Sequence, residues 1–195
     1  LPELSPEEGE FISIISWNIN HGWSSDGRMN IHDIAERITQ QEAGVVALQD
    51  ANALQWPLGN SDLTGYLSTS LTMHLHNGLP TSTPGDTGNS LLSKYPLLLS
   101  RTHVLPSATT AATAASRAGL DASCNLCATT QQTMTEARLL VGDVPVTVIN
   151  TQLERVDGVI HRADTARRIE YIEKIANETK TPLIIVGGLG IEPND

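Results

Sequence analysis

The sequence has little positive charge and few aromatic side chains. Lys and Arg number 12 against 22 Asp and Glu, which gives a formal net charge of −10, and aromatic residues make up 4% of the chain. An acidic surface repels nucleic-acid phosphates and anionic lipids, so we expect neither as a direct partner. No window approaches the ~20 apolar residues that a membrane-spanning helix needs, so membrane association is expected only through partners.

Cysteine is almost absent, and the two that exist are Cys124 and Cys127, spaced C-x-x-C in a stretch rich in Ser, Thr and Ala. A zinc site requires two further ligands, and no second C-x-x-C or H-x₃₋₅-H pattern follows. A thioredoxin-like pair would open a helix after a strand, which this stretch does not provide. Plain loop thiols are the simplest interpretation, and a local disulfide or a metal or redox site stays open.

The 195 residues, 39% of them hydrophobic, are enough for one globular domain with a buried core. We expect an exposed arm over residues 1–10 and a single domain over 11–195. Within that domain, residues 107–130 lack an apolar stripe and are expected to form a long loop. The sequence begins at Leu1 without Met, which indicates a processed chain of an organelle such as the mitochondrion, or of the secretory pathway.

Hydrophobic patterning predicts strands and helices that alternate around a β-rich middle. Near-continuous apolar runs at both ends of the sequence are typical of central strands buried on both faces. The expected strands are 11–19, 45–50, 73–76, 89–93, 97–105, 137–141, 144–150 and 183–186. The expected helices are 31–43, capped by Asn30 and stopped by Gly44, then 60–71 and 159–178. The fold class is therefore α/β or α+β with a layered, mixed sheet.

Motifs at the ends of these strands follow the order of a known family. They are SWNI at 16–19, ALQD at 47–50, GNSLLSKYP at 88–96 and VINTQL at 148–153. Together they resemble the endonuclease/exonuclease/phosphatase (EEP, DNase I-like) superfamily, and VGGLG at 186–190 falls where that family carries Gly-Asp-x-Asn. The resemblance runs from Phe11 to Asp195. Residues 58–64 and 103–107 look most like the soluble domain of GPI-anchor lipid-remodelling proteins.

The resemblance implies a four-layer α/β/β/α sandwich with a divalent-metal site at one end of its two sheets. In active members, a strand-one Asn and a strand-two Glu hold Mg²⁺ or the phosphate, and a His stabilises the transition state. The Asp of Gly-Asp-x-Asn aligns or deprotonates the attacking water, and a C-terminal Asp-His pair completes the site. Such chemistry requires hard oxygen ligands for the metal, a base for water and cations that face the developing charge.

Carried over residue by residue, this site is degenerate. Asn18 is kept and Asp50 replaces the Glu, so these two are the candidates for residual metal or phosphate binding, although strand-end hydrogen bonding explains them more simply. Gln152 replaces the His and cannot pass a proton. Gly188 and Gly190 replace the Asp and the Asn. The sequence ends before the segment that would hold the Asp-His pair, so the sandwich is expected to be truncated at its C-terminus.

These losses favour a catalytically inactive EEP-fold protein. General acid–base catalysis alone contributes roughly 10²–10⁴-fold in rate, and its loss together with metal and oxyanion stabilisation is crippling. We therefore expect a pseudoenzyme that needs no cofactor and acts as a structural, accessory or interaction subunit of a larger protein complex. The alternative is a Mg²⁺-dependent phosphodiesterase or hydrolase that acts in GPI-anchor lipid remodelling.

Two other polar clusters have a plain structural explanation that we prefer. His74 and His76 alternate on one strand and share a face, but a metal site would need a third ligand. A basic cluster on the last predicted helix is interleaved with acidic residues, so we expect it to be a solvated face rather than a phosphate clamp. It consists of Arg162, Arg167 and Arg168.

Overall fold

A computed structural model describes residues 11–24, 26–51, 62–78, 88–105, 133–152 and 162–188, apart from the side chains of 162–165, 167 and 168. Several expectations therefore fall outside the described residues: the arm over 1–10, the loop over 107–130 with both cysteines, Gly190, and the basic cluster of the last helix.

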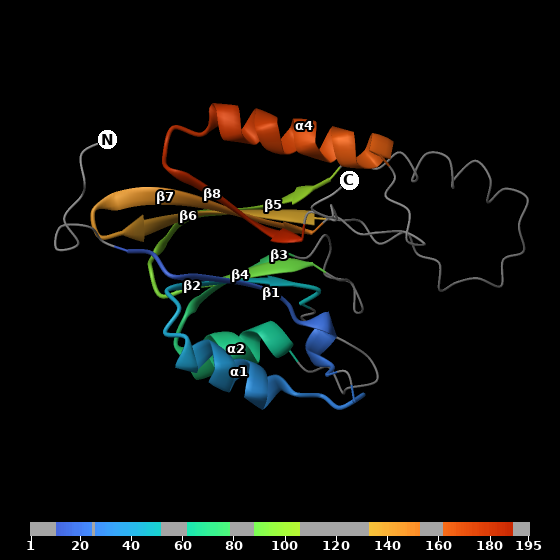
Figure 1. Cartoon of the computed structure of the whole chain (residues 1–195). Coiled ribbons are helices and arrows are strands. Elements are labelled where there is room, and N and C mark those ends of the chain that lie inside the picture. The colour runs from blue at the N-terminus through green and yellow to red at the C-terminus, as the bar shows by residue number, and fades with distance from the viewer. Residues whose placement is uncertain are drawn as a thin grey trace, which may run out of the picture.

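Eight strands form two four-stranded sheets (Figure 1). The first sheet has the order β1 (Ile14–Asn18), β2 (Val45–Gln49), β4 (Asn89–Ser93) and β3 (His74–Gly78). The second has the order β5 (Leu97–Val104), β6 (Thr133–Val141), β7 (Val144–Gln152) and β8 (Leu183–Gly188). β1 and β2 are parallel, as are β7 and β8, while every other neighbouring pair is antiparallel.

Helices cover the outer faces of both sheets. α1 (Ile31–Gln40) and α2 (Leu63–Leu71) lie on the first sheet, and α4 (Arg162–Glu178) lies on the second (Figure 1). The four-layer α/β/β/α sandwich expected from the resemblance is therefore confirmed. Among the helices that the structure describes, none is long and apolar enough to cross a bilayer.

The two-residue periodicity of the strands separates three apolar cores. On β6, Ala137 and Leu139 point inward and join the core between the sheets, whereas Met134 points outward and packs with Ile172 of α4. On β2, Val46 and Leu48 join the core beneath α1 and α2, and Val45 faces the second sheet. Alternate residues of one strand therefore stabilise different layers, and the inward-facing set leads toward the strand ends where the expected site lies.

The first and last predicted strands were wrong in one respect, because both are edge strands rather than central ones. β1 pairs only with β2, and β8 pairs only with β7, among the described residues. Ile185 on β8 is 43% exposed. An apolar run is also compatible with an edge, because periodicity reports side-chain hydrophobicity and not which backbone groups are paired.

The expected ends of the first helix also need correction. Asn30 precedes α1, but its side chain caps no backbone N–H. The helix ends before Gly44, at Gln40, and Glu42 takes the left-handed conformation with a φ of 51°. Gly44 is instead required by packing, because a Cβ there would lie 2.8 Å from the ring of Tyr95. By contrast, Asp62 caps α2, as its carboxylate accepts a hydrogen bond from the Gly65 N–H.

Candidate functional site

The sequence-predicted residues meet at one end of the space between the sheets. Asn18 closes β1, Asp50 follows β2, and Gln152 closes β7. β1 and β2 are parallel within one sheet, and β7 and β8 are parallel within the other, so their carboxyl ends gather side chains from four strands. This is the place where the resemblance puts the family's site.

Asn18, Asp50 and Gln152 form a closed triangle of hydrogen bonds. The Asn18 amide donates to Asp50 Oδ2 over 2.6 Å and to Gln152 Oε1 over 3.0 Å. The Gln152 amide donates to the same Asp50 oxygen over 3.0 Å. The carboxylate is therefore stabilised by neutral amide donors, and the polar atoms that face one another are already satisfied.

The backbone around the triangle turns through left-handed residues. Asn20, His21 and Asp50 all have positive φ values, of 45°, 58° and 49°. The Asn20 N–H donates to Asn18 Oδ1 over 2.8 Å, and the His21 N–H donates to the Asp50 carbonyl over 2.9 Å. Asn, Asp and His adopt this region more readily than other residues with a side chain, so these turns fix the strand ends without a large cost.

Two adjacent glycines of β8 border the triangle and differ sharply. Gly187 has a φ of +127°, and a Cβ there would lie 1.7 Å from the Thr151 carbonyl oxygen, so only glycine fits. Gly188 is paired with Gln152, and its nearest neighbours to a Cβ are Gln152 atoms at 3.8 and 3.9 Å. A Cβ at position 188 would therefore make only ordinary contacts with Gln152, at the position where the family carries Asp.

In this arrangement the triangle turns few free oxygens toward a divalent cation. Mg²⁺ is usually bound through one or two carboxylates, with free oxygens turned toward the metal. Here Asp50 is the single carboxylate, both amides turn N–H groups toward it, and Asn18 Oδ1 is held by the Asn20 N–H. Nowhere in the described part of the chain do three His, Cys, Asp or Glu side chains gather as a metal-binding group.

A buried polar pair directly beneath the triangle was missed by sequence reasoning. Gln49 donates to Asn150 Oδ1 over 2.7 Å, and Asn150 donates to the carbonyl oxygens of Leu48 and Ser90 over 2.9 Å each. Asn150 has no exposed surface, and Gln49 is 2% exposed. The available signal was an amide at an inward-facing position of an apolar strand, since a buried amide needs partners from neighbouring chain segments.

The histidine pair of β3 has a structural role. His74 is exposed, while His76 is half-buried and lies 3.3 Å, from its Nε2, from the Thr102 hydroxyl of β5. Burial lowers the pKa of His76, which favours the neutral ring. The two rings of this strand face therefore differ in their surroundings. His21 is hydrogen-bonded to Asp50 through its backbone N–H, and its buried ring Nδ1 makes no hydrogen bond among the described residues.

Solved structures with this fold come from several kinds of EEP protein. The chain matches an endonuclease/exonuclease/phosphatase from Beutenbergia cavernae DSM 12333 with a TM-score of 0.68 and 19% identity, covering 94% of this chain and 48% of that one. It matches sphingomyelinase C from Streptomyces griseocarneus with a TM-score of 0.66 and 17% identity, covering 94% and 66%. A D. rerio TDP2 complexed with a single-strand DNA product gives 0.62 and 13%, covering 93% and 61%.

At these identities the likeness establishes the fold and no common activity. The chain spans about half to two thirds of the length of these three structures. A model of the family described as "PGAP2IP, C-terminal nuclease-like domain" matches residues 9–195, which is almost the whole chain. The chain therefore belongs to the family of PGAP2IP C-terminal nuclease-like domains, within the EEP superfamily.

Proposed function

We propose that this chain is a catalytically inactive EEP domain that acts as an accessory or interaction subunit of a larger protein assembly. The observation that carries the proposal is the closed triangle of Asn18, Asp50 and Gln152 beside the bare Gly188. Two of its three members are amides, which neither take up a proton nor carry charge, and the carboxylate oxygen Oδ2 of Asp50 already accepts from both of them.

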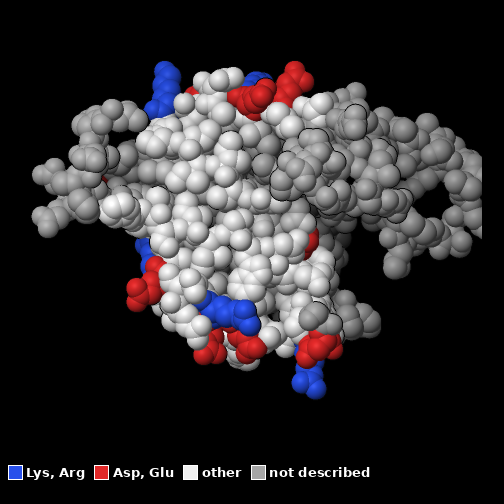
Figure 2. Space-filling view, viewed as in Figure 1, with Lys and Arg blue, Asp and Glu red and all other residues white. Residues whose placement is uncertain are grey.

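A second observation supports the interaction role. β1 and β8, which are edge strands among the described residues, lie on the same side of the sandwich and contact each other across the gap between the sheets. Neither strand contains a charged residue. In Figure 2, charged side chains gather over α4 and α1, and the surface between them is largely uncharged. Proteins usually protect free edges with charge, so an uncharged pair of edges favours a partner that covers them.

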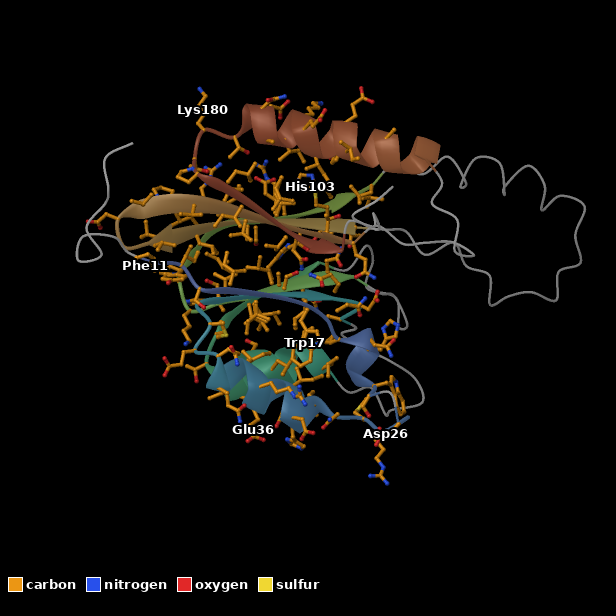
Figure 3. The ribbon with its side chains drawn as sticks, in the orientation of Figure 1. Phe11, Trp17, Asp26, Glu36, His103 and Lys180 are labelled. Carbon is orange, nitrogen blue, oxygen red and sulfur yellow. The ribbon has the colours of Figure 1, made fainter. Side chains whose placement is uncertain are left out.

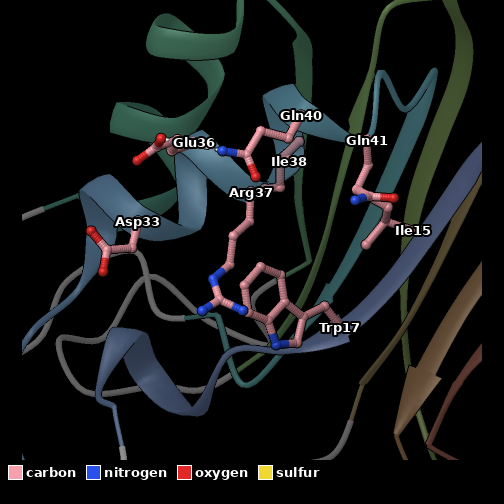
Figure 4. A pocket seen from close by; sticks show the side chains of 8 residues that line it. All are labelled: Ile15, Trp17, Asp33, Glu36, Arg37, Ile38, Gln40 and Gln41. Carbon is pink, nitrogen blue, oxygen red and sulfur yellow. Dashed lines mark hydrogen bonds between the residues drawn. The ribbon is translucent and has the colours of Figure 1, made fainter.

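A cavity next to β1 extends this surface. It has a volume of about 630 Å³ and is lined by Ile15 and Trp17 of the strand and by Arg37 and Ile38 of α1 (Figure 4). The Arg37 side chain extends toward Trp17, which is half-buried. A strand added to β1 would place alternate side chains on this side of the sheet, where the cavity offers apolar surface.

The inactivity is tested with a generic phosphodiester. The full chain, incubated with bis(p-nitrophenyl) phosphate and millimolar Mg²⁺ or Mn²⁺, should release no nitrophenol above the buffer rate. Metal-dependent turnover by the unmodified chain that Asp50→Ala abolishes would overturn the proposal.

That outcome would support the second candidate, a Mg²⁺-dependent phosphodiesterase or hydrolase in GPI-anchor lipid remodelling. The specific observation in its favour is that Asn18 and Asp50 lie side by side, with 2.6 Å between Asn18 Nδ2 and Asp50 Oδ2. The family's name, which refers to PGAP2IP, is compatible with either candidate.

The subunit role is tested by purification from the source under native conditions. The tagged chain should co-migrate with a larger complex, and Ile185→Lys, which places a charge on the free edge of β8, should release it. The matched control is Leu98→Lys on β5, at the opposite edge of the same sheet. Leu98 is 51% exposed and Ile185 is 43% exposed, so the two changes are comparable for the isolated domain. A monomer in the native extract would speak against the role.

A further inference from the structure

A second polar cleft lies on the outer face of the second sheet, away from the triangle. The cavity has a volume of about 280 Å³ and is enclosed by β5, β6 and α4. Figure 3 places His103, one of its lining residues, between the sheet and this helix. The triangle lies between the two sheets, so the body of the second sheet separates the two sites.

One wall of the cleft is a fixed chain of hydrogen bonds. His103 Nδ1 lies 3.1 Å from the Tyr171 hydroxyl, and His103 Nε2 lies 2.8 Å from Glu136 Oε2. The side chains of His103 and Glu136 are only 15% and 6% exposed. A neutral imidazole satisfies every partner if the Tyr171 hydroxyl donates to Nδ1 and the Nε2–H donates to Glu136. This wall is therefore preorganised and needs no ligand of its own.

The remaining walls carry cations that form no ion pair within 4.0 Å among the described residues. Arg101, Arg138 and Lys174 all line the cleft. Among the described residues, Arg28 and Asp26 form an ion pair within 4.0 Å and His103 lies against Glu136, but neither Glu136 nor Glu178 comes within 4.0 Å of these three cations. The positive charge therefore faces the cavity in a chain whose net charge is −10.

Arg138 gives the clearest sign of a missing partner. Its Nε is buried and makes no hydrogen bond within the described part of the chain. Buried polar atoms in native proteins are nearly always paired, so such an atom at the wall of a cavity calls for a partner in that cavity. A guanidinium pairs best with an oxyanion, which can accept parallel N–H bonds.

From these observations we propose that the cleft between β5, β6 and α4 binds a phosphate-type oxyanion, held by Arg138 and Lys174 with Arg101 at the rim. Arg101 is exposed at the edge of the sheet, whereas Arg138 lies deeper. The three cations exceed the two carboxylates that line the cleft, Glu136 and Glu178, by one charge. The cavity is smaller than the roughly 300–1,000 Å³ typical of drug-sized ligands, so it suits a free phosphate or the phosphate group of a small monoester.

The test is a titration of the full chain with inorganic phosphate and, separately, with glycerol 3-phosphate, followed by calorimetry at low ionic strength. Saturable binding of one equivalent of either probe supports the proposal, and the stronger of the two identifies the free ion or the monoester as the ligand. No saturable binding of either would overturn it. The outcome is independent of whether the triangle hydrolyses a phosphodiester.

Matched variants separate a site from general electrostatic attraction. Lys174→Met and Lys180→Met each remove one positive charge from an exposed lysine, but only Lys174 lines the cleft (Figure 3 labels Lys180). Lys174→Met should weaken binding roughly tenfold or more, because it removes a charged contact. Lys180→Met should change binding by no more than about twofold at the same ionic strength. Equal weakening by both would overturn the proposal.

Arg138→Met is the stronger variant, since it keeps the buried aliphatic stem and removes the guanidinium. It should abolish saturable phosphate binding, while Arg28→Met, at a solvent-exposed ion pair elsewhere, should leave it intact. If Arg138→Met fails to fold, the comparison of Lys174 with Lys180 still decides the outcome.

Discussion

The space between the sheets contains two rungs of amide hydrogen bonds that differ mainly in burial. The inner rung joins Gln49 to Asn150, which are 2% and 0% exposed. The outer rung joins Asn18, Asp50 and Gln152 at the open end of the same space, where Asn18 is exposed. Both rungs cross from the first sheet to the second, and both use side chains that face inward.

The difference in burial decides which rung the fold depends on. An unpaired polar atom in the interior costs about 1–3 kcal/mol, whereas near the surface water replaces the lost partner. Substitutions in the inner rung are therefore expected to destabilise the fold. Substitutions in the outer rung are expected to affect stability little, so only a function would select against them. Stability alone would not preserve the family's His and Asp, which explains how Gln152 and Gly188 are tolerated at those positions.

The two adjacent glycines of β8 also differ in how strongly the fold constrains them. Substitution of Gly187 gives the largest expected change in the free energy of unfolding. Gly187→Ala should destabilise the protein by about 4 kcal/mol, because the Cβ would collide with the Thr151 carbonyl and the φ of +127° is unfavourable for alanine. Gly188→Ala, its matched control, should change the free energy of unfolding by less than about 0.5 kcal/mol. Urea denaturation measures both. Equal effects would show that position 188 is constrained by the fold.

Removal of the inner rung should have the next largest effect. Asn150→Ala leaves the carbonyls of Leu48 and Ser90 without this amide donor and removes the shortest of the three hydrogen bonds that the Gln49 amide donates. We expect a loss of about 2–3 kcal/mol in the free energy of unfolding, measured with urea. Asn177→Ala, at an exposed position of α4, is the control and should stay within about 0.5 kcal/mol. A loss no greater than that of the control would contradict the structural role of the inner rung.

The contrast explains how much the sequence could predict. Hydrophobic alternation located the strands and helices, and the strand-end motifs brought Asn18, Asp50 and Gln152 together correctly. Alternation could not show that Ile14–Asn18 and Leu183–Gly188 are edges, because edge status depends on pairing between distant segments. The pairing of Gln49 with Asn150 was hidden for the same reason, since they are 101 residues apart.

The cleft beneath α4 was also out of reach of sequence reasoning. Its residues come from two strands and a helix, and each strand contributes alternate positions to it. His103 appeared in the sequence only as part of a family motif, with no partner assigned. Its contacts with Glu136 and Tyr171 span 33 and 68 residues. Spacing along the chain carries no information about such contacts, so only the fold reveals them.

A substitution in the outer rung should have little effect on the free energy of unfolding, in contrast to one in the inner rung. Asp50→Asn keeps the shape of the side chain, and asparagine accepts the positive φ at this position. The amide oxygen can still accept from Asn18 and Gln152, so we expect a change in the free energy of unfolding within about 1 kcal/mol.

The opposite substitution, of an amide by a carboxylate, can be made in the inner rung. Asn150→Asp would place a carboxylate against the carbonyl oxygens of Leu48 and Ser90, with no water to solvate it. It should be far more destabilising than Asp50→Asn when the two variants are compared by urea denaturation. If Asp50→Asn were the more harmful of the two, the triangle would be a structural requirement and not the remnant of a site.

A third contact between the sheets, at the opposite edge, has intermediate burial and the smallest expected effect. His76 on β3 lies 3.3 Å from the Thr102 hydroxyl on β5. Burial lowers its pKa below the ordinary value of 6.5, although a hydrogen bond to the Arg101 backbone opposes the shift. The unfolded chain therefore binds this proton more readily than the folded protein, so stability is full above pH 6.5 and falls as the pH drops below it.

His76→Gln should flatten this fall, because glutamine does not titrate. The measurement is the free energy of unfolding at about pH 7.5 and about pH 5.5, where stability should decline less in the variant than in the unmodified protein. His74→Gln removes the exposed histidine of the same strand and should leave the decline unchanged. If His74→Gln reduces the loss of stability at low pH as much as His76→Gln does, burial of His76 is not the cause of that loss. The conclusion that burial determines how much each contact between the sheets contributes to stability would then be wrong for this contact.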